Sequence, residues 1–329
     1  MNRMIKLLGT GKYLPNKKIS AEELAEKIGV TKEWIMKKSG VETRYFVESE
    51  TTAFMGAQAG LQAIQNAGLS LKEIDAVVSA GGVMQQSIPC TAALIQQELG
   101  LEGSGIPAFD INSTCLGFVT ALDLLSSMIT CGRYKNILLV CSDIASTGLN
   151  WEHLESCTLF GDGAAAVVIG PTPKDESSKV YSAHIETYCE GVNYCRIQGG
   201  GSALHPRNHG LGVDKRFLFE MNGMEIFRMA SKTILPFMNK LLKTLHLDDI
   251  DLVIPHQASV MAIRIIQKKL GLENDQIVNI ARHCGNVIAA SLPMALHEAI
   301  QNHRLKRGDK CVLLGTSAGF SIGGIILEY

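Results

Sequence analysis

No stretch of this sequence is apolar for long enough to cross a membrane. Apolar residues make up 46% of the 329 residues. The longest apolar runs, such as residues 137–140 and 164–169, are much shorter than the ~20 residues that a membrane-spanning helix needs. The first eight residues also lack the apolar core and the cleavage site of a signal peptide. These absences favour a soluble, cytoplasmic protein with no membrane span.

The sequence also lacks an excess of charge of either sign. It has 31 lysine and arginine residues against 32 aspartate and glutamate residues, for a formal net charge of −1. Proteins that bind nucleic acids or anionic membranes through their overall electric field are strongly basic. We therefore expect no nucleic acid partner. Any charged partner would have to bind to a local cluster of charged residues.

Cysteine is present, but in no pattern typical of a disulfide framework or a metal site. The nine cysteines are an odd number, and no two have Cys-x-x-Cys spacing. The closest pair, Cys189 and Cys195, has no histidines at the offsets of zinc ligands. Others, such as Cys141 and Cys311, lie inside apolar runs. We expect reduced thiols in a reducing compartment and no metal.

Two phosphate-binding patterns are absent as well. The glycines at 199–201 are not followed by a helix that opens with lysine and a hydroxyl residue. Gly9 and Gly11 follow the first apolar run, but the next residues, Lys-Tyr-Leu-Pro, do not open the helix that a dinucleotide-binding turn needs. A Rossmann domain and a tightly bound cofactor are therefore not expected.

The sequence does contain a regular alternation of short apolar runs and longer helical patterns. Apolar runs at residues 75–79, 106–109 and 136–141 alternate with helical patterns at about 90–99 and after residue 115. This order is typical of an α/β protein with a largely parallel sheet.

A weak internal repeat divides the chain. Residues 131–142 lead on to the glycine-rich stretch 160–170, and residues 305–316 lead on to 319–328 with the same order of basic turn, apolar strand, glycine-rich connection and second strand. Residues 171–179, rich in proline, serine and charge, predict a surface connection. We predict two similar halves, residues 1–172 and 173–329, packed as one unit.

One cysteine, Cys115, lies at the junction between an apolar run and a helical pattern. Asn112, Ser113 and Thr114 are residues typical of helix caps, and apolar residues at 116, 119, 122, 125, 128 and 129 predict a helix with a buried stripe. Free backbone N–H groups at a helix N-terminus favour a thiolate. The pattern therefore predicts a nucleophile with a lowered pKa, although a cysteine that only packs at a helix start remains an alternative.

Two polar residues follow strand-like runs in the second half. His256 comes directly after the apolar run 251–255, and Asn286 comes after the strand-like run 277–280 and ahead of a helix of small residues. Taken singly, each is also explained by a structural histidine or a turn asparagine. Together with Cys115 in the first half, they suggest a Cys/His/Asn site between the halves.

With residues 33–41 and 159–168, these three stretches resemble the β-ketoacyl-acyl-carrier-protein synthase III family of thiolase-fold condensing enzymes. The resemblance runs nearly end to end, and the order of the motifs is specific. It implies a thiolase-like fold of two fused α-β-α-β-α halves, with the nucleophile in the N-terminal half, the histidine and asparagine in the C-terminal half, and a homodimer.

The resemblance also implies a division of catalytic roles. Cys115 matches the acylated nucleophile, which takes an acyl group from acyl-coenzyme A. His256 and Asn286 match the pair that donates hydrogen bonds to the enolate left when a malonyl thioester loses carbon dioxide. The backbone N–H groups of Cys115 and Ala318 would stabilise the tetrahedral oxyanion. Ala318 stands where the family has glycine, so its backbone dihedrals must accept a Cβ.

The sequence departs from the family at the expected coenzyme A site. Trp34 matches the tryptophan that stacks on the adenine. Leu154 replaces the arginine expected on the other side of that base, so an apolar face remains and a cation is lost.

It also departs at the expected surfaces for protein partners. Met261 replaces an arginine that helps to dock the acyl carrier protein, while Arg264, Lys268 and Lys269 follow on the same predicted helix and form an alternative basic face. A merely solvated helix face explains them equally well. Ile88 occupies the position of a phenylalanine that in some members reaches into the partner's acyl pocket. The smaller side chain favours acyl groups longer than acetyl.

Three functions follow from these features. The main one is decarboxylative condensation of the Cys115-bound acyl group with malonyl-acyl carrier protein, in fatty acid biosynthesis or a specialised pathway. The second is an acyltransferase or condensing enzyme that passes the same acyl group to a different nucleophile. The third is a binding protein without turnover, against which the presence of Cys115, His256 and Asn286 argues.

Overall fold

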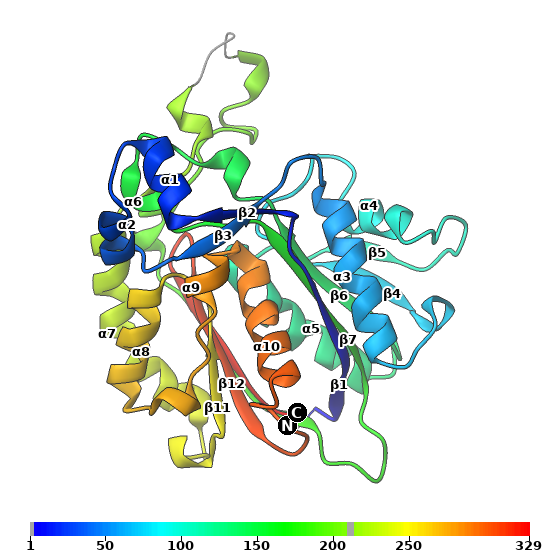
Figure 1. Ribbon diagram of the computed structural model, residues 1–329. Helices are drawn as coiled ribbons and strands as arrows, with labels where there is room; N and C mark the ends of the chain where they lie inside the picture. The colour runs from blue at the N-terminus through cyan, green and yellow to red at the C-terminus, as the bar shows by residue number, and fades with distance from the viewer. Residues whose placement is uncertain (1–2, 209–213) are drawn as a thin grey trace.

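Two mixed β-sheets frame the structure, a computed structural model that describes residues 3–208 and 214–329 (Figure 1). The first sheet has the strand order β1-β7-β6-β4-β5, and the second has the order β11-β12-β13-β8. In chain order the strands of the first sheet are β1 (Ile5–Tyr13), β4 (Ala76–Ser79), β5 (Ala108–Asp110), β6 (Ile137–Asp143) and β7 (Gly163–Pro171). Those of the second are β8 (Lys179–Thr187), β11 (Leu252–Pro255), β12 (Lys310–Ser317) and β13 (Ser321–Glu328).

Helices lie on both sides of each sheet and produce five layers. The helices α5 (Gly117–Thr130) and α10 (Ser291–Gln301) lie between the sheets and contact both of them (Figure 1). The helices α3 (Thr52–Asn66) and α4 (Thr91–Glu98) cover the outer face of the first sheet. The helices α7 (Gly223–Leu242) and α8 (Val260–Leu270) lie on the outer side of the second. The main hydrophobic core is therefore the layer between the sheets.

Smaller elements complete the fold at one end. These are the pair β2 (Lys17–Ser20) and β3 (Thr43–Phe46), the pair β9 (Cys195–Arg196) and β10 (Glu220–Met221), and the helices α1 (Ala21–Ile28), α2 (Lys32–Lys38), α6 (Leu154–Cys157) and α9 (Ala281–Cys284). None of the helices within the described residues has the length and apolar character needed to span a membrane.

The repeat in the sequence corresponds to a repeated strand arrangement. In the first sheet β4 and β6 are parallel, and β6 is antiparallel to β7. In the second sheet β11 and β12 are parallel, and β12 is antiparallel to β13. The α/β, thiolase-like fold class is thus confirmed, while the division between residues 172 and 173 stays a prediction.

The predicted strand at residues 277–280 is wrong. Only one bridge, between Val253 and Ile277, joins this run to β11. The side chain of Gln257 forms hydrogen bonds with the backbone groups that follow. Its Oε1 accepts from the N–H groups of Ile280 and Ala281 at 2.8 and 3.1 Å, and its Nε2 donates to the carbonyl of Val278 at 3.3 Å. A buried glutamine therefore replaces the ladder of a strand.

Candidate active site

Three turns from different parts of the chain meet between the sheets. Cys115 lies in a 3₁₀ turn, Thr114–Leu116, directly ahead of α5. His256 follows β11, and a Cβ at Gly315 of β12 would lie 2.9 Å from the His256 Cβ and 3.2 Å from Leu116 Cδ2. Asn286 lies between α9 and a second 3₁₀ turn, Ile288–Ala290, which packs against the turn of Cys115. The structure thus brings the three predicted segments together.

Three residues in the turns of Cys115, Asn286 and Ala318 have an unfavourable backbone conformation. Thr114, beside Cys115, has φ of 47°, and Ile288, two residues after Asn286, has φ of 46°. Phe320, two residues after Ala318, has φ of 42°. Positive φ is a genuine outlier for β-branched and bulky residues, and such strain gathers at functional sites. The surrounding contacts must therefore hold these turns in place.

The amide of Asn286 is held in one orientation. Its Oδ1 accepts from the backbone N–H of Ile288 at 2.9 Å and from Ser291 Oγ at 3.4 Å. Its Nδ2 donates to the carbonyl of Ala258 at 3.4 Å, which joins it to the segment of His256. Because the oxygen is engaged by donors, the amide offers its N–H groups to a ligand.

His256 is buried and uncharged. Its backbone N–H donates to the carbonyl of Leu314 at 2.7 Å, which fixes the residue against β12. Burial lowers the pKa of the imidazole to about 4. Its Nδ1 is buried and has no hydrogen-bond partner among the residues that the structure describes. A neutral imidazole of this kind can donate one hydrogen bond and accept another.

The predicted lowering of the Cys115 pKa is wrong. Burial raises the pKa of this thiol to about 12, and the neighbouring Cys195 and Asp143 add to the rise. The backbone N–H groups of Ala318 and of Cys115 itself act in the opposite direction. Removal of the thiol from water therefore outweighs the helix N-terminus, and the resting group is a thiol.

Ala318 occupies the turn between β12 and β13. The positive φ angles of this turn fall on Gly319, at 78°, and on Phe320, so Ala318 keeps a conformation that suits its Cβ. Its backbone N–H is one of the groups that lower the pKa of the Cys115 thiol. The exchange of the family's glycine for alanine thus leaves the backbone donor in place.

A cavity of about 270 Å³ reaches His256 from the side of α7 and α8. Its lining is mostly apolar and includes Leu159, Ala258 and Ile322. Phe227 on α7 and Met261 on α8 also line it, and they are 48% and 51% exposed, so they stand at the open end. The cavity suits a slender, largely apolar ligand such as an acyl chain or a flexible thioester arm.

Trp34 and Leu154 lie on neighbouring helices at the same end of the molecule. Lys38 of α2 forms an ion pair with Glu155 of α6 at 3.2 Å, and Glu155 is next to Leu154. The Nζ of Lys38 also lies 5.8 Å from the centre of the Trp34 ring. Lys38, on the same helix as Trp34, therefore partly substitutes for the arginine that Leu154 replaces.

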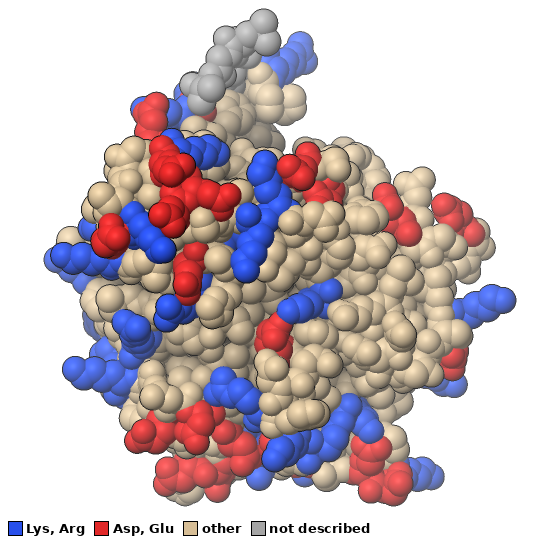
Figure 2. Space-filling view, in the orientation of Figure 1, with Lys and Arg blue, Asp and Glu red and all other residues tan. Residues whose placement is uncertain are grey.

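The predicted basic face on α8 is exposed. Arg264, Lys268 and Lys269 are all exposed. Lys269 also lines the cavity near His256. Figure 2 shows lysine and arginine side chains along the left edge of the molecule, where α7 and α8 lie. The cavity mouth thus combines exposed apolar residues with positive charge.

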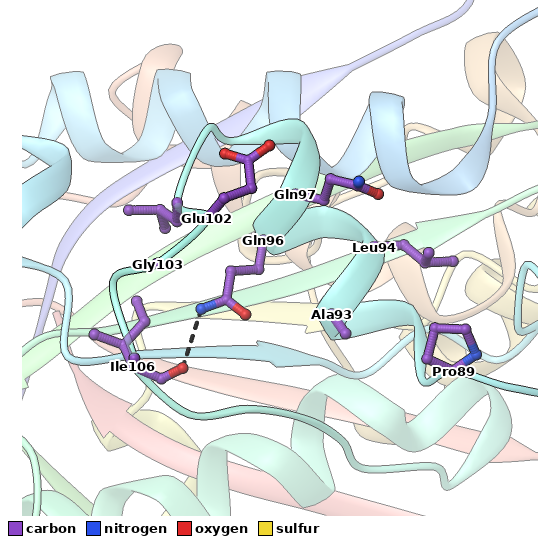
Figure 3. Close-up of a pocket in the computed structure, with 10 residues that line it drawn as sticks. Pro89, Ala93, Leu94, Gln96, Gln97, Glu102, Gly103 and Ile106 are labelled. Carbon is purple, nitrogen blue, oxygen red and sulfur yellow. Dashed lines mark hydrogen bonds between the residues drawn. The ribbon is translucent and has the colours of Figure 1, made fainter.

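Ile88 lies away from this cavity. Its side chain is 85% exposed, and it stands just before α4 on the outer side of the first sheet. The next residue, Pro89, borders a separate cavity of about 350 Å³ between α4 and the loop 101–106, where Gln96 Nε2 donates to the carbonyl of Ile106 at 3.0 Å (Figure 3). Within one chain Ile88 therefore touches no acyl site.

Two features of the site were missed from the sequence. Asp143, at the end of β6, is fully buried beneath the turns of Cys115 and Asn286. The cavity residues Met221, Ile226 and Phe227 come from β10 and α7. A signal existed for Asp143, because a charged residue ended an otherwise apolar strand. Across the described residues, no group of three or more His, Cys, Asp or Glu side chains is placed to hold a metal ion.

The sequence and the fold are both similar to one group of known proteins. Residues 109–189 match the family described as 3-oxoacyl-[acyl-carrier-protein (ACP)] synthase III, and residues 242–329 match the family of its C-terminal part. The chain is 34% identical to the β-ketoacyl-[acyl-carrier-protein] synthase III of Clostridium perfringens (strain SM101) over 326 residues, which cover 98% of each chain.

Relatives from Aquifex aeolicus (strain VF5) show the same similarity. The β-ketoacyl-[acyl-carrier-protein] synthase III of that organism is 34% identical over 327 residues, 98% of this chain and 99% of that one. A crystal structure of 3-oxoacyl-[acyl-carrier-protein] synthase III from the same organism superposes with a TM-score of 0.88 at 32% identity, over 99% of this chain and 100% of that chain.

Proposed function

Since this chain belongs to the β-ketoacyl-acyl-carrier-protein synthase III family and is an acyl-transferring condensing enzyme, we propose that Cys115 carries the acyl group while His256 and Asn286 assist its condensation with malonyl-acyl carrier protein. The names of the relatives do not favour the alternative in which the acyl group passes to a different nucleophile.

In the first half-reaction the Cys115 sulfur attacks the carbonyl carbon of acyl-coenzyme A. Because burial keeps Cys115 a thiol, its proton has to leave during the attack, and the neutral imidazole of His256 can accept it. The proton then passes to the sulfur of the departing coenzyme A. The main support for the nucleophile is that the backbone N–H groups of Cys115 and Ala318 act to lower the pKa of its thiol; donors near the sulfur can stabilise the tetrahedral oxyanion.

In the second half-reaction the malonyl thioester loses carbon dioxide and becomes an enolate. The imidazole N–H of His256 and the Nδ2 group of Asn286 donate to the enolate oxygen. The fixed orientation of Asn286, whose Oδ1 is engaged by Ile288 and Ser291, supports this role. The enolate carbon then attacks the acyl carbonyl, and collapse of the tetrahedral intermediate releases the Cys115 thiolate and the β-ketoacyl product.

The acyl donor is proposed to enter through the cavity that reaches His256. Trp34 and Leu154 would hold the adenine of coenzyme A, with Lys38 as the nearby cation. The apolar cavity between α7 and α8 suits the thioester arm. Nothing in this proposal requires a tightly bound cofactor. The nine cysteines, all of them free thiols, support a reducing, cytoplasmic location.

The acyl carrier protein is proposed to dock on α8. Arg264, Lys268 and Lys269 have no ion-pair partner within the described residues, so their charge is available to an acidic partner. Lys269 borders the cavity, which would place a bound carrier where its arm can enter. Exposed Phe227 and Met261 add an apolar contact at the same mouth.

A homodimer is proposed through the edge of the first sheet that ends in β5. Within the described part of the chain this strand pairs only with β4, and Ile88 nearby is the most exposed of the large apolar residues there. In a dimer Ile88 would be covered and could reach the acyl site of the other subunit. Its role in an acyl pocket therefore depends on a partner.

The division of roles is tested by following acylation and carbon dioxide release separately. Cys115→Ala should abolish acylation. Asn286→Ala should slow decarboxylation of malonyl-acyl carrier protein by about 10²–10³-fold, the usual cost of one oxyanion donor, and acylation far less. His256→Ala removes the base proposed for acylation as well as a donor to the enolate, so it should slow both steps, decarboxylation more than acylation. Equal losses in both steps would contradict this assignment.

A further inference from the structure

Asp143 is a buried carboxylate that none of the proposed steps uses. It is the last residue of β6 and has no exposed surface. Its Oδ1 accepts from the backbone N–H groups of Gly82 and Val83 at 2.7 and 2.9 Å. Its Oδ2 accepts from the backbone N–H of Ala290 at 3.1 Å. This carboxylate is buried among backbone donors and forms no ion pair with any described residue, so its presence needs an explanation.

The first pair of hydrogen bonds leads to the turn of Cys115. A Cβ at Gly82 would lie 2.5 Å from Ile288 Cγ2 and 3.4 Å from the carbonyl carbon of Thr114. Gly82 is therefore in contact with both strained residues, the one beside Cys115 and the one after Asn286. By fixing the backbone of Gly82, Asp143 fixes the surface against which both turns pack.

The other hydrogen bond leads to the turn of Asn286. Ala290 is the N-cap of α10 and has no side chain that could cap the helix. The carboxylate that meets its backbone N–H comes instead from the first sheet. Between Asn286 and Ala290 lies Ile288, whose N–H holds the Asn286 amide. Asp143 thus anchors the far end of the turn that orients this amide.

Strain explains why such an anchor is needed. Left-handed backbone at a β-branched residue is unfavourable and persists only where the surroundings hold it. Thr114 and Ile288 both have this conformation. Asp143 is the one side chain within the described residues that hydrogen-bonds to the 82–83 segment and to the 289–290 segment at once.

The carboxylate also acts on the nucleophile through its charge. Asp143 is one of the groups that raise the pKa of Cys115. Burial raises the pKa of Asp143 itself to about 7, while the backbone N–H groups of Val83, Ala290, Gly82 and Ala289 act to lower it. Asp143 also raises the pKa of the buried thiol of Cys141 on the same strand.

We propose that Asp143 is a positioning residue that holds the strained turns of Cys115 and Asn286 in register across the two sheets. The proposal rests on the function proposed above for these two residues. Asp143 does not touch the reacting atoms. Its loss should therefore disturb the geometry of the enolate site and the charge near the thiol without removing a reacting group.

Asp143→Asn tests this by keeping the shape of the side chain. An amide has one acceptor oxygen, so it can serve the two donors of Gly82 and Val83 but turns an NH₂ group toward the N–H of Ala290. Decarboxylation of malonyl-acyl carrier protein should fall by about 10²-fold, the cost of a misplacement of ~1 Å, while acylation of Cys115 changes by less than about threefold. Equal losses in the two steps, or no loss in either, would overturn the proposal.

Alkylation of Cys115 by iodoacetamide without substrates gives a second readout that a merely structural role would not change. At pH 8.5, where wild-type Asp143 is charged, Asp143→Asn should react several-fold faster, and at pH 5.5 the two proteins should react equally. An identical ratio at both pH values counts against a charge effect. If wild type shows no condensation at all, the proposed function fails. The pH dependence of Cys115 alkylation still tests the role of Asp143 in that case.

Two further variants keep the test decisive if Asp143→Asn is unstable. Asp75→Asn is the matched control, because Asp75 also holds backbone N–H groups, of Lys135 and Asn136, but at the other end of β4. It should leave both steps unchanged. Asp143→Asn with Ile288→Gly should recover decarboxylation at least fivefold over Asp143→Asn, because glycine adopts positive φ without strain. Absence of recovery would contradict the strain argument.

Discussion

Cys115 and His256 are both kept uncharged at rest, and burial is the cause in each case. It raises the pKa of the thiol to about 12 and lowers that of the imidazole to about 4. A thiolate and imidazolium ion pair is therefore not the resting state of this site. A neutral imidazole suits both proposed roles, since it can accept the proton of the thiol and later donate a hydrogen bond to an enolate.

The ionisation of His256 provides a direct test at this scale. An ordinary histidine has a pKa of about 6.5, so its ring signals would change between pH 8 and pH 5. Those of His256 should not, because its pKa is about 4. The measurement is ¹⁵N NMR of histidine-labelled protein, with His256→Gln to assign the signal. A His256 midpoint near 6.5 would contradict the burial argument.

The same shift has a consequence for stability. Because the folded-state pKa of His256 is lower than the unfolded value of about 6.5, its uncharged form favours folding above that pH. The contribution of His256 to folding stability is lost as the pH falls from about 6.5 toward 4, because over this range His256 is protonated in the unfolded state but not in the folded state.

At the scale of elements, α7 and α8 define the entrance to the site. They supply the exposed apolar residues Phe227 and Met261 and the basic residues of α8. Apolar contact at the centre with charge around it is typical of a transient protein interface. The two helices therefore account for how the site can serve a protein-bound substrate while its chemistry stays buried.

Charge reversal on α8 tests this docking surface. Arg264→Glu with Lys268→Glu should raise the KM for malonyl-acyl carrier protein about tenfold, the equivalent of about 1.4 kcal/mol, and leave acylation by acyl-coenzyme A unchanged. The basis is attraction between the basic face and an acidic carrier, so added salt should raise the wild-type KM more than that of the variant.

Lys72→Glu is the control for this experiment, because Lys72 is exposed on a turn far from α8 in the sequence and in the fold. It should leave the KM unchanged. A carrier KM that does not respond to the change on α8 would show that α8 is only a solvated helix face.

The elements were predicted from the sequence more completely than the site. The strands around residues 137–141 and 311–316 and the helix after Cys115 were visible because apolar periodicity is a local property. The strand predicted at 277–280 was wrong, because a glutamine 20 or more residues away in the sequence takes the hydrogen bonds that a neighbouring strand would make. The left-handed turns at Thr114 and Ile288 were also missed, since β-branched residues normally exclude that conformation.

The sequence indicated those candidate site residues whose own side chains are suited to the proposed chemistry. Cys115, His256 and Asn286 stand out as a nucleophile, an imidazole and an amide at the ends of apolar runs. Asp143 does not, because its partners are the backbone groups of residues 82, 83 and 290, and only the folded chain brings these together. The sign of the Cys115 pKa shift was likewise hidden, because burial depends on the whole fold.

At the scale of the whole molecule, two surfaces around the first sheet could form a dimer interface. The helix α3 carries no charged residue, and Figure 2 shows a broad uncharged area where it lies. This uncharged α3 surface is one candidate for a dimer interface. The second candidate is the edge of the sheet at β5, with exposed Ile88. Two surfaces can therefore compete for a role in a dimer.

A pair of matched variants separates these surfaces. Ile88→Asp should convert the proposed dimer to a monomer in sedimentation velocity experiments, because a charge would be buried in the interface. Leu61→Asp, on the 41% exposed Leu61 of α3, should leave the dimer intact. Loss of the dimer only with Leu61→Asp would move the interface to α3, and a monomeric wild type would remove the dimer from the account.

The central claim is that Cys115 carries an acyl group that malonyl-acyl carrier protein then removes. Intact-protein mass spectrometry of wild type and Cys115→Ala, after incubation with acyl-coenzyme A esters of graded length, tests it most directly. We predict an acyl adduct in wild type only, which malonyl-acyl carrier protein discharges as a β-ketoacyl product. An adduct that persists in Cys115→Ala, or one that malonyl-acyl carrier protein leaves untouched, would contradict the account.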